Sequence, residues 1–322
     1  SIKRNINSIE ANFSSDSLYK QSKQSKNSYL RQRAKLLSSI RQYFNFHNVL
    51  EVQTPVLNEY PTSEPSIENF VIENAEKCRY LRTSPESSLK KLVASRIGDI
   101  FEVGPVFRKG EESPIHLNEF TMLEWYRLGY DHKKLIRDVE LLVDYCGGRF
   151  EFRQITFMEL FVEHVGLNPH STSNAELSRA IVRFGLKLND TEKEDRDYLL
   201  TCLYVLGVEP NIKAYGAFFL TDFPKELRAY ARLSDDKYCS AQRFELIING
   251  VEVANGYHEV IDPIEQQHCF EIDNETRLRR GLTATKIDKG WIAALKKGMP
   301  ACAGVAVGLE RLQMVLDEKI NI

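Results

Sequence analysis

The sequence of 322 residues lacks any long apolar run, and this absence limits where the chain can act. A membrane-spanning helix needs about 20 consecutive apolar residues, and no stretch approaches that length. The first residues, SIKRNINSIEANFSSDSLYK, also lack the apolar core of a secretory signal peptide. We therefore expect a cytoplasmic protein without a membrane partner.

Cysteine is scarce, and no two cysteines lie close together in the sequence. The scattered residues are Cys78, Cys146, Cys202, Cys239, Cys269 and Cys302. Their spacing argues against a zinc knuckle or a disulfide framework and fits a reducing compartment. The formal net charge is −2, so the chain lacks the basic excess typical of a nucleic-acid binder, although a local basic patch stays open.

The chain divides into a polar start and one large folded region. Residues 1–28 are rich in Ser, Asn and Lys without apolar periodicity, which predicts a mobile tail too short to fold alone. From Tyr29, apolar residues recur at helical spacing. Antiparallel hairpins with helices before and between them predict a single α+β domain over 29–322, with an antiparallel sheet flanked by helices.

Turn and cap signals predict several local elements. Helices are expected over 135–145, over much of 156–208 and over 265–281, and GAFFLTDFP is expected to be a buried strand. In the segment TSPE, we predict Ser84 as the N-cap of a helix and Pro85 as its first residue.

The stretch FELIINGVEVANGYHEV, residues 244–260, carries three glutamates: Glu245, Glu252 and Glu259. Asn-Gly between two apolar runs predicts a hairpin with a type I′ turn. The resulting register would pair Ile247 with Glu252 and Glu245 with Ala254. Glu245 and Glu252 would then be diagonal neighbours on one face. Two converging carboxylates favour a hard cation such as Mg²⁺; the alternative is a solvent-exposed strand face.

Two further segments carry side chains suited to binding anions. In VFRKGEESPIHLNEFTMLEWY, an arginine ends one strand, and a carboxylate and aromatic residues occupy the return strand. In GVAVGLERL, small residues allow close approach of a ligand, and an arginine opens a helix. Each feature alone has a structural alternative. These are Arg108 as a salt-bridge partner, Phe120 as a core residue, Gly304 and Gly308 as packing residues, and Arg311 as the partner of a surface carboxylate.

Together, these segments resemble the ordered motifs of a class II aminoacyl-tRNA synthetase catalytic domain of the lysyl type. The helix ending at VLEVQTPVL resembles motif 1, FRKGEESPIHLNEFTMLEWY resembles motif 2 and GVAVGLERL resembles motif 3. TSPE and VEVANGYHEV resemble the segments around the lysine substrate. The resemblance runs from about Tyr29 to the C-terminus. It implies a homodimer with Pro55 at the interface, and a reaction that joins a substrate carboxylate to the α-phosphate of ATP.

The resemblance also implies which residues hold the nucleotide. Arg108 and Arg311 would be the catalytic residues. Arg108 would bridge the substrate carboxylate and the α-phosphate, and Arg311 would hold the far phosphates and stack on adenine opposite Phe120. Glu245 and Glu252 would hold Mg²⁺. The full set implied for ATP is Arg108, Lys109, Gly110, Glu111, His116, Phe120, Glu252, Val253, Gly308 and Arg311.

A second set of residues is implied for the lysine substrate. Glu259 is similar to the family's partner for the ε-ammonium, a group that is costly to bury unpaired. Tyr257 would pack on the methylenes, and Asn255 would bind the carboxylate end. The full set is Ser84, Pro85, Glu86, Glu124, Tyr126, Asn255, Tyr257, Glu259 and Ala306. Strict alternation would put Glu259 on the face opposite Glu252, so we predict a bulge at Gly256 that redirects the chain.

Motif 2 departs from the family pattern. The usual Arg-x-Glu is replaced by Arg-Lys-Gly-Glu at 108–111, which places the acid one residue late. The following loop, SPIHLNEF, lacks the arginine that usually holds the γ-phosphate, and Leu117 stands where asparagine is common. Lys109 and His116 are the candidates to replace that arginine. The departures imply a lower affinity for the phosphates.

Within the family, EFTMLEWYR, EKEDRDYLL, GVEPNI and ANGYHE resemble the stand-alone bacterial paralogues that act on elongation factor P. These activate (R)-β-lysine with ATP and transfer the lysyl group to a lysine ε-amino group of that protein. With fewer than about 30 residues before the catalytic region, we expect no anticodon-binding domain, and tRNA is not the expected acceptor. Ala306 stands where lysyl-tRNA synthetases usually have glycine. Its methyl group could favour a β-amino acid roughly 10- to 200-fold; a neutral exchange is the alternative.

Two other functions stay open. One is a truncated lysyl-tRNA synthetase that uses L-lysine and tRNA. The other is a catalytically silent regulator that senses lysine or ATP. The altered motif 2 loop favours the regulator, whereas the retained arginines and glutamates of the implied site oppose it. ATP–pyrophosphate exchange would separate the silent protein from both enzymes.

Overall fold

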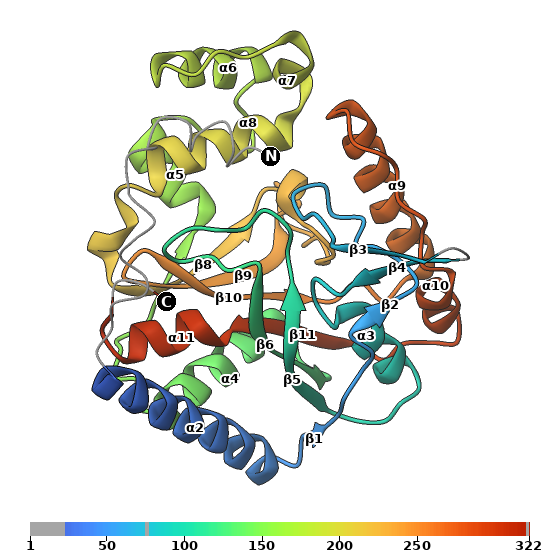
Figure 1. Ribbon diagram of the computed structural model, residues 1–322. Coiled ribbons are helices and arrows are strands. Elements are labelled where there is room, and N and C mark those ends of the chain that lie inside the picture. Colours follow the sequence, from blue (N-terminus) through green and yellow to red (C-terminus); the bar gives the residue numbers. More distant parts are fainter. Residues whose placement is uncertain (1–22, 75–76, 320–321) are drawn as a thin grey trace.

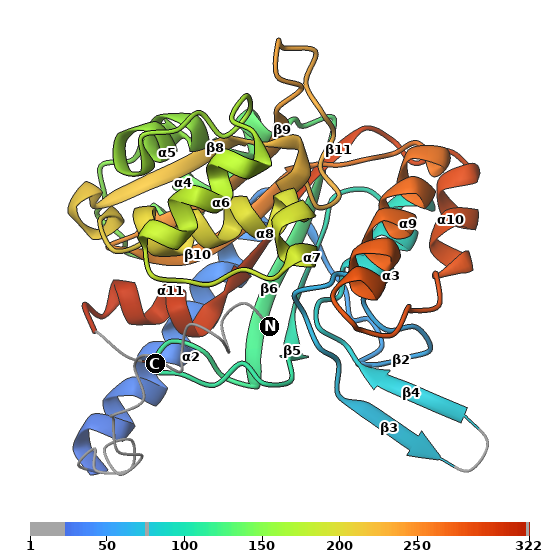
Figure 2. The same ribbon diagram turned by 90° about the horizontal axis from the view of Figure 1, so that it is seen from above.

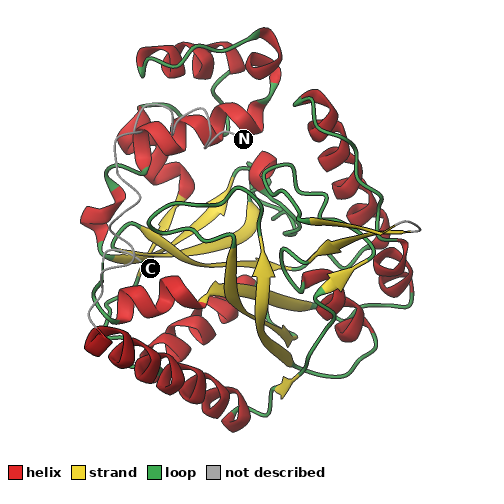
Figure 3. Cartoon of the chain, in the orientation of Figure 1, coloured by secondary structure: helices red, strands yellow, loops and turns green. Residues whose placement is uncertain are grey.

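A computed structural model describes residues 23–74, 77–319 and 322 (Figure 1). Most of the predicted polar tail at 1–28 lies outside these residues. The helix predicted from Tyr29 begins earlier, because α2 spans Lys23–Phe46 and includes the last residues assigned to the tail. Figure 3 shows strands at the centre of the molecule and helices around them.

One eight-stranded sheet forms the centre of the fold, in the order β1-β5-β6-β11-β10-β9-β8-β7. Its strands are β1 (Leu50–Glu51), β5 (Ile100–Phe107), β6 (Glu119–Leu128), β11 (Cys302–Gly308), β10 (Val251–His258), β9 (Ala241–Ile248), β8 (Ala217–Phe223) and β7 (Arg153–Thr156). The strands from β5 to β8 in this order pair antiparallel. Only the edge strands β1 and β7 pair parallel with their neighbours. The predicted α+β fold with a mainly antiparallel sheet is confirmed.

A small sheet and the helices surround this centre. The small sheet has the order β2 (Leu57–Asn58), β4 (Lys77–Leu81) and β3 (Val71–Asn74). The helices after α2 are α3 (Glu86–Ala94), α4 (His132–Tyr145), α5 (Phe157–Val165), α6 (Asn174–Arg183), α7 (Asp190–Glu194), α8 (Arg196–Leu203), α9 (Pro263–Arg279), α10 (Lys289–Lys296) and α11 (Leu309–Leu316). Short turns of other helix types lie at η1 (Tyr204–Val208), η2 (Ile212–Tyr215) and η3 (Lys225–Leu227).

The two faces of the large sheet bury different sets of apolar residues. On one face, Trp125, Phe244 and Val305 join a core that includes residues of α2, α4 and α11. On the other face, Phe218 packs with residues of α5, α6 and α8, and Cys302 packs with residues of α3, α9 and α10. Figures 1 and 2 show the group α5, α6 and α8 and the group α3, α9 and α10 on opposite sides of the sheet's centre. Between them, the same face of the middle strands lines a large cavity.

The acidic hairpin β9–β10 forms with the predicted turn but with a different register beyond it. Asn249 and Gly250 both have positive φ, 52° and 84°, as a type I′ turn requires. Glu252 pairs with Ile247 as predicted, but Glu245 pairs with Asn255 instead of Ala254. The cause is a bulge between Glu252 and Ala254, which leaves Val253 without a partner.

This bulge also corrects the prediction for Gly256. Gly256 pairs regularly with Phe244 and Val305, so no bulge lies there. The bulge at Val253 has already shifted by one residue the alternation of side chains between the two faces of β10. Residues 252, 255 and 257 therefore lie on one face, as Glu245 does. Gly256 has a different reason to be glycine, since a Cβ there would lie 2.6 Å from Cε1 of Phe244.

The helix after TSPE begins one residue later than predicted. Pro85 occupies the N-cap position of α3 and makes no side-chain capping bond, and the first helical residue is Glu86. The Ser84 hydroxyl still accepts a hydrogen bond from the Glu86 amide at 2.9 Å. Because this hydroxyl also donates to Glu124 at 2.8 Å, the start of α3 is fixed to β6.

Candidate active site

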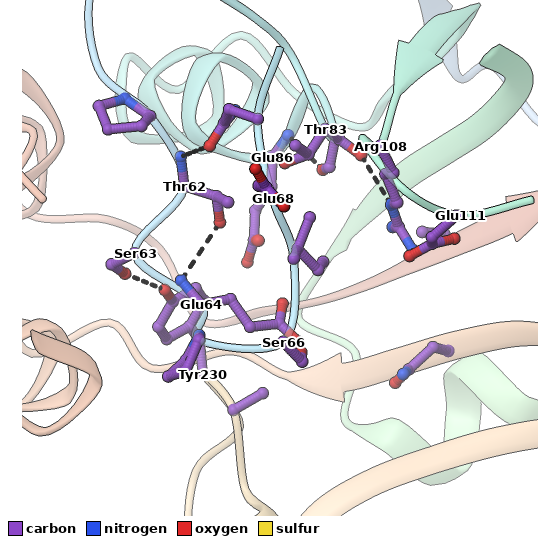
Figure 4. A pocket seen from close by; sticks show the side chains of 18 of the residues that line it. Thr62, Ser63, Glu64, Ser66, Glu68, Thr83, Glu86, Arg108, Glu111 and Tyr230 are labelled. Atoms are coloured by element: carbon purple, nitrogen blue, oxygen red, sulfur yellow. Dashed lines mark hydrogen bonds and ion pairs between the residues drawn. The ribbon is translucent and has the colours of Figure 1, made fainter. Parts of the chain in front are cut away.

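The cavity has a volume of about 1090 Å³ and lies between loop 61–68, the loop that joins β5 to β6, and the face of β6, β9, β10 and β11. Figure 4 shows side chains of loop 61–68 on one side of it and Arg108 and Glu111 on the other. This volume is slightly above the range of about 300–1000 Å³ that small-molecule sites usually have. It suits two ligands bound next to each other.

Arg108 stands at the end of β5 and is held by several contacts. Its Nε donates to the Thr83 carbonyl at 3.3 Å, and its guanidinium lies 5.3 Å from the centre of the Phe120 ring. Glu111 lies 3.9 Å from the Arg108 guanidinium. Arg108 therefore reaches the cavity as a fixed, planar hydrogen-bond donor suited to carboxylate or phosphate oxygens.

The motif 2 loop has its own local geometry, which accounts for the displaced acid. Gly110 has a φ of +79°, a conformation that glycine adopts more readily than other residues. Asn118 closes the loop, because its side chain accepts from the Gly110 amide at 2.9 Å and its carbonyl accepts from the Arg108 amide at 2.8 Å. A glutamate at 110 would be strained, so the acid is found at 111.

The two candidates for the missing arginine are engaged within the protein. Lys109 Nζ lies 2.6 Å from Glu68 Oε1, and the Lys109 amide donates to the Glu68 carbonyl at 2.9 Å. His116 Nδ1 lies 2.7 Å from the Ser113 hydroxyl. Both residues line the cavity. Lys109 thus ties the motif 2 loop to loop 61–68.

Glu245 and Glu252 lie close enough to interact, as predicted. Burial, followed by the charge of Glu252, raises the pKa of Glu245 to about 7. Arg243 opposes this rise from 2.5 Å. The two carboxylates repel each other, and a cation between them would relieve this repulsion. A cation whose other ligands are water and phosphate oxygens fits such a pair. Within the described part of the chain, no group of three or more acidic, His or Cys side chains has metal-site geometry.

Arg311, at the start of α11, connects the same parts of the site. Its Nε donates to the Ile115 carbonyl at 3.2 Å and its Nη1 to the Glu252 carbonyl at 2.9 Å. The Glu252 carboxylate lies 3.5 Å from the guanidinium. These contacts fix Arg311 between the motif 2 loop and the bulge of β10. Gly308 leaves open space beside it, since an added Cβ would meet only Arg311 Cδ, at 3.9 Å.

The other end of the cavity is strongly acidic. Glu124 is buried and accepts hydrogen bonds from the hydroxyls of Ser84 and Tyr126, both at 2.8 Å. Glu259 is 1% exposed and lies 2.7 Å from Lys90 Nζ, which also lies 2.7 Å from Glu86. Three carboxylates and one ammonium group therefore share this acidic end.

Burial has a large effect on the carboxyl groups of Glu124 and Glu259. Desolvation, followed by the charge of Glu86, raises the pKa of Glu124 to about 8. Desolvation also raises the pKa of Glu259 to about 8; Lys90 opposes this shift, whereas Glu86 and Glu124 add to it. An acid whose pKa is raised in this way holds a proton until a cation replaces it. The acidic end is thus suited to bind ammonium groups.

Strand β11 is the floor between Glu124 and the acidic hairpin. Gly304 pairs with Tyr126 and Tyr257, and an added Cβ would lie 2.6 Å from Glu259 Oε1 and even closer to the Tyr126 ring. Ala306 pairs with both Glu124 and Asn255. Its methyl group therefore lies on the face of the sheet that these two side chains share.

Loop 61–68 brings residues to the site that the sequence did not predict. Ser63 donates to Asp273 of α9 at 2.7 Å and lies 2.7 Å from the Tyr230 hydroxyl. Glu64 follows at the edge of the cavity (Figure 4). Burial raises the pKa of Glu64, and Arg108 is among the charges that oppose the shift. Ser63 is thus placed by contacts with residues distant in sequence.

The cavity brings together the predicted residues of both sets. All of them except Pro85 line it, and Pro85 is buried beside it in the turn before α3. Val253 is 2% exposed and packs in the core, so only its main chain is available to a nucleotide. Lys90 and Arg243 were missed. Each had a signal: Lys90 lies four residues after Glu86 on a helix, and Arg243 lies two residues before Glu245 on a strand.

No helix among the described residues is long and apolar enough to cross a membrane. The family model of class II tRNA synthetases (D, K and N) matches residues 10–322. The chain is similar to the elongation factor P–(R)-beta-lysine ligase of Vibrio cholerae, with 39% identity over 297 residues, 89% of this chain and 91% of the relative. A ligase of the same name from Pasteurella multocida is 39% identical over 88% of this chain and 89% of its own length. That of Haemophilus influenzae (strain PittGG) is 39% identical over 91% of this chain and 92% of its own length. The chain therefore belongs to the class II tRNA synthetase family of the D, K and N group.

Proposed function

We propose that the protein is an ATP-dependent ligase that activates (R)-β-lysine as an adenylate and transfers the lysyl group to a lysine ε-amino group of elongation factor P. The observation that carries this proposal is the polarity of one cavity. Arg108 lies where β5 ends, opposite Asn118, whereas Glu124 lies six residues further along, on β6, near Glu86 and Glu259. A diamino acid has one carboxylate and two ammonium groups, which match the arginine and these carboxylates.

Activation joins the substrate carboxylate to the α-phosphate and releases pyrophosphate. Both reactants are anions, so the site must place positive charge where they meet. Arg108, fixed by Thr83 and Phe120, would bind the carboxylate and the α-phosphate. Arg311 would bind the far phosphates and face the adenine. The enzyme would act through positioning and electrostatics, without a covalent intermediate on its own side chains.

Magnesium fits the pair Glu245 and Glu252 as part of this proposal. Burial and the charge of Glu252 raise the pKa of Glu245 to about 7 although Arg243 opposes the rise, so Arg243 does not fully compensate the negative charge on this pair. A divalent ion bound to ATP would supply the missing charge and neutralise the phosphates. Glu245 and Glu252 would hold that ion, and Arg243 would fix the orientation of Glu245.

The acceptor is proposed from the relatives, whose name gives elongation factor P as the substrate. An uncharged amine of the acceptor would attack the adenylate carbonyl, form an amide and release AMP. Its ammonium form must lose a proton first. Because the acceptor works in translation, we also propose a cytoplasmic location. L-lysine and tRNA remain the substrates of the alternative enzyme.

A homodimer through the motif 1 region is a further part of the proposal. Phe46 at the end of α2 is 80% exposed, and Leu50 and Leu57 are 49% and 46% exposed. Pro55 is exposed between them. Exposed apolar side chains in this segment favour burial against a second subunit.

ATP–pyrophosphate exchange with (R)-β-lysine and with L-lysine, measured in parallel, tests the function. We expect faster exchange with (R)-β-lysine, and transfer of its label to elongation factor P. Preference for L-lysine together with charging of tRNA would favour the alternative enzyme. If neither amino acid supports exchange, the protein is a binder of lysine or ATP and not a ligase.

A further inference from the structure

Lys90 is an ionised side chain packed behind the acidic end of the cavity, against the lining residues Glu86 and Glu259. Its side chain is fully buried. Its Nζ lies 2.7 Å from Glu86 Oε1 and 2.7 Å from Glu259 Oε2. Burial works against its charge, but Glu259 and Glu86 together raise the pKa of Lys90. Lys90 is therefore a permanent cation between two residues of the proposed lysine pocket.

The surroundings of Lys90 keep it in this place. The ammonium group lies 4.9 Å from the centre of the Trp291 ring and 5.5 Å from that of Tyr230, distances at which a cation is attracted to an aromatic face. The titratable groups that face it or interact with it are Glu86, Glu124, Tyr230, Glu259, Cys269 and Cys302. The cysteines and the tyrosine stay uncharged near neutral pH, because burial raises their pKa values.

The ionised side chains at the acidic end of the cavity do not cancel one another, and a net negative charge is left. Glu86, Glu124 and Glu259 contribute three negative charges when ionised, and Lys90 contributes one positive charge. Two negative charges stay uncompensated by the protein. A buried excess of this size is unfavourable unless cations or protons bind. A ligand with two ammonium groups supplies the matching charge.

Glu259 keeps one oxygen available for such a ligand. Lys90 lies against Oε2, whereas Oε1 is directed toward the floor at Gly304, where the missing side chain leaves space. Glu124, already fixed by two hydroxyl groups, offers a second acceptor. The carboxylates of Glu124, on β6, and Glu259, which follows β10, both line the cavity and suit two separate ammonium groups.

We propose that Lys90 is a positioning and specificity residue, which holds Glu86 and Glu259 in place and sets the pocket to accept a substrate with two ammonium groups. This inference rests on the proposed function, because it concerns the amino-acid pocket of that reaction. Lys90 itself does not touch the reacting atoms. It would act through the charge and orientation of the two carboxylates that it binds.

The test replaces Lys90 with methionine, which keeps the length of the side chain and removes its charge. Lys193→Met is the matched control, since Lys193 is also a helical lysine paired with a carboxylate, Asp190 at 2.9 Å, but this pair is exposed on the surface. Pyrophosphate exchange is measured over a range of pH, with (R)-β-lysine varied at saturating ATP and with ATP varied at saturating (R)-β-lysine. Exchange by the wild-type protein is measured before the variants. If it is absent with both lysine isomers, the proposed function is wrong, whatever the role of Lys90.

We expect Lys90→Met to raise the KM for (R)-β-lysine about tenfold or more near neutral pH, with an unchanged KM for ATP. Without Lys90, Glu259 takes up a proton more readily, so the loss should shrink as the pH rises and the carboxyl ionises again. The control should stay within about twofold of the wild type. A KM unchanged in Lys90→Met, or a loss that is the same at every pH, overturns the proposal, because packing alone has no pH dependence in this range.

A second measurement uses the wild-type protein, and so does not depend on the folding of a variant. Cadaverine and n-pentylamine have the same carbon chain but two ammonium groups and one, respectively. Both amines are tested as competitive inhibitors of pyrophosphate exchange. The inhibition constant of cadaverine should be lower than that of n-pentylamine by a factor of about ten or more. Equal inhibition by the two amines overturns the match between the pocket charge and a doubly charged ligand.

Discussion

Ala306 and Glu124 lie directly opposite each other in strands β11 and β6, and Asn255 faces Ala306 from β10. The methyl group of Ala306 is therefore placed between a carboxylate suited to an amino group and an amide suited to a carboxylate. In an α-amino acid these two substrate groups share one carbon, and in a β-amino acid they are one carbon further apart. A change at Ala306 should thus alter which isomer fits.

We predict that Ala306→Gly increases the use of L-lysine relative to (R)-β-lysine. Removal of one methyl group changes discrimination by roughly 10- to 200-fold at most. The ratio of kcat/KM for the two isomers in pyrophosphate exchange gives the answer. An unchanged ratio would mean that Ala306 is a neutral exchange for glycine, and that other residues choose the isomer.

Gly304→Ala should remove lysine activation and leave ATP binding intact. The added Cβ would lie 2.6 Å from Glu259 Oε1 and would overlap the Tyr126 ring, so both side chains would have to move. Pyrophosphate exchange measures the loss, and binding of a fluorescent ATP analogue measures the nucleotide site. Wild-type exchange in this variant would contradict the assignment of Glu259 and Tyr126 to the pocket.

Lysine binding should become tighter as the pH rises toward the pKa of the two buried carboxyls. The pKa values of Glu124 and Glu259 are raised to about 8, and only the ionised forms pair with ammonium groups. The value of kcat/KM for lysine reports the ionisation of the free enzyme. We expect it to increase between about pH 6.5 and about pH 8.5. A flat profile would indicate that both carboxyls are already ionised at the lower limit.

The same shifts predict a pH-dependent stability. Between the ordinary carboxyl pKa and about 8, the folded protein holds protons on Glu124 and Glu259 that the unfolded chain releases. Stability should therefore fall as the pH rises through this range. Thermal unfolding with and without lysine should show the largest stabilisation by lysine at the upper end. Glu259→Gln should reduce this dependence.

The sequence predicted the fold and the composition of the site better than it predicted the geometry. The hairpin turn at Asn249 and the pairing of Ile247 with Glu252 follow from local rules, and the structure has both. The bulge was expected at Gly256 but occurs at Val253, because the alternation pattern shows only that one residue must be extra. The position of the bulge depends on how β10 pairs with its neighbouring strands.

Contacts between distant segments account for what the sequence did not predict. Lys90 and Glu86 are four residues apart on α3, but Glu259, the second partner of Lys90, follows β10. The network of Ser63, Tyr230 and Asp273 joins three separate parts of the chain. A local pattern shows the spacing of Lys90 and Glu86, but none shows the contacts that these residues make with distant segments. The family resemblance indicated the substrate-binding residues but not the side chains that hold them.

Arg108→Ala should abolish adenylate formation, because it removes the donor placed where the two anions meet. Arg149→Ala is the matched control: Arg149 is largely exposed and pairs with Asp144 on the surface, where an ion pair contributes little. Loss of one fixed charge-assisted donor typically costs roughly 100- to 1000-fold in rate. Pyrophosphate exchange should fall by at least this factor in Arg108→Ala and stay near the wild-type rate in the control. Equal rates in both variants would refute the assignment of motif 2.

Exposed apolar residues near α2 lead to a prediction for the homodimer. Phe46→Asp places a charge on a side chain that is 80% exposed in the single chain, so the isolated subunit should fold as before. If Phe46 is buried in a dimer, the charge would be costly there and the dimer should dissociate. Light scattering at micromolar concentration gives the mass of each variant, with Phe184→Asp, at a site 45% exposed on another face, as the control. A wild-type monomer, or a dimer that tolerates Phe46→Asp, would place the interface elsewhere or exclude it.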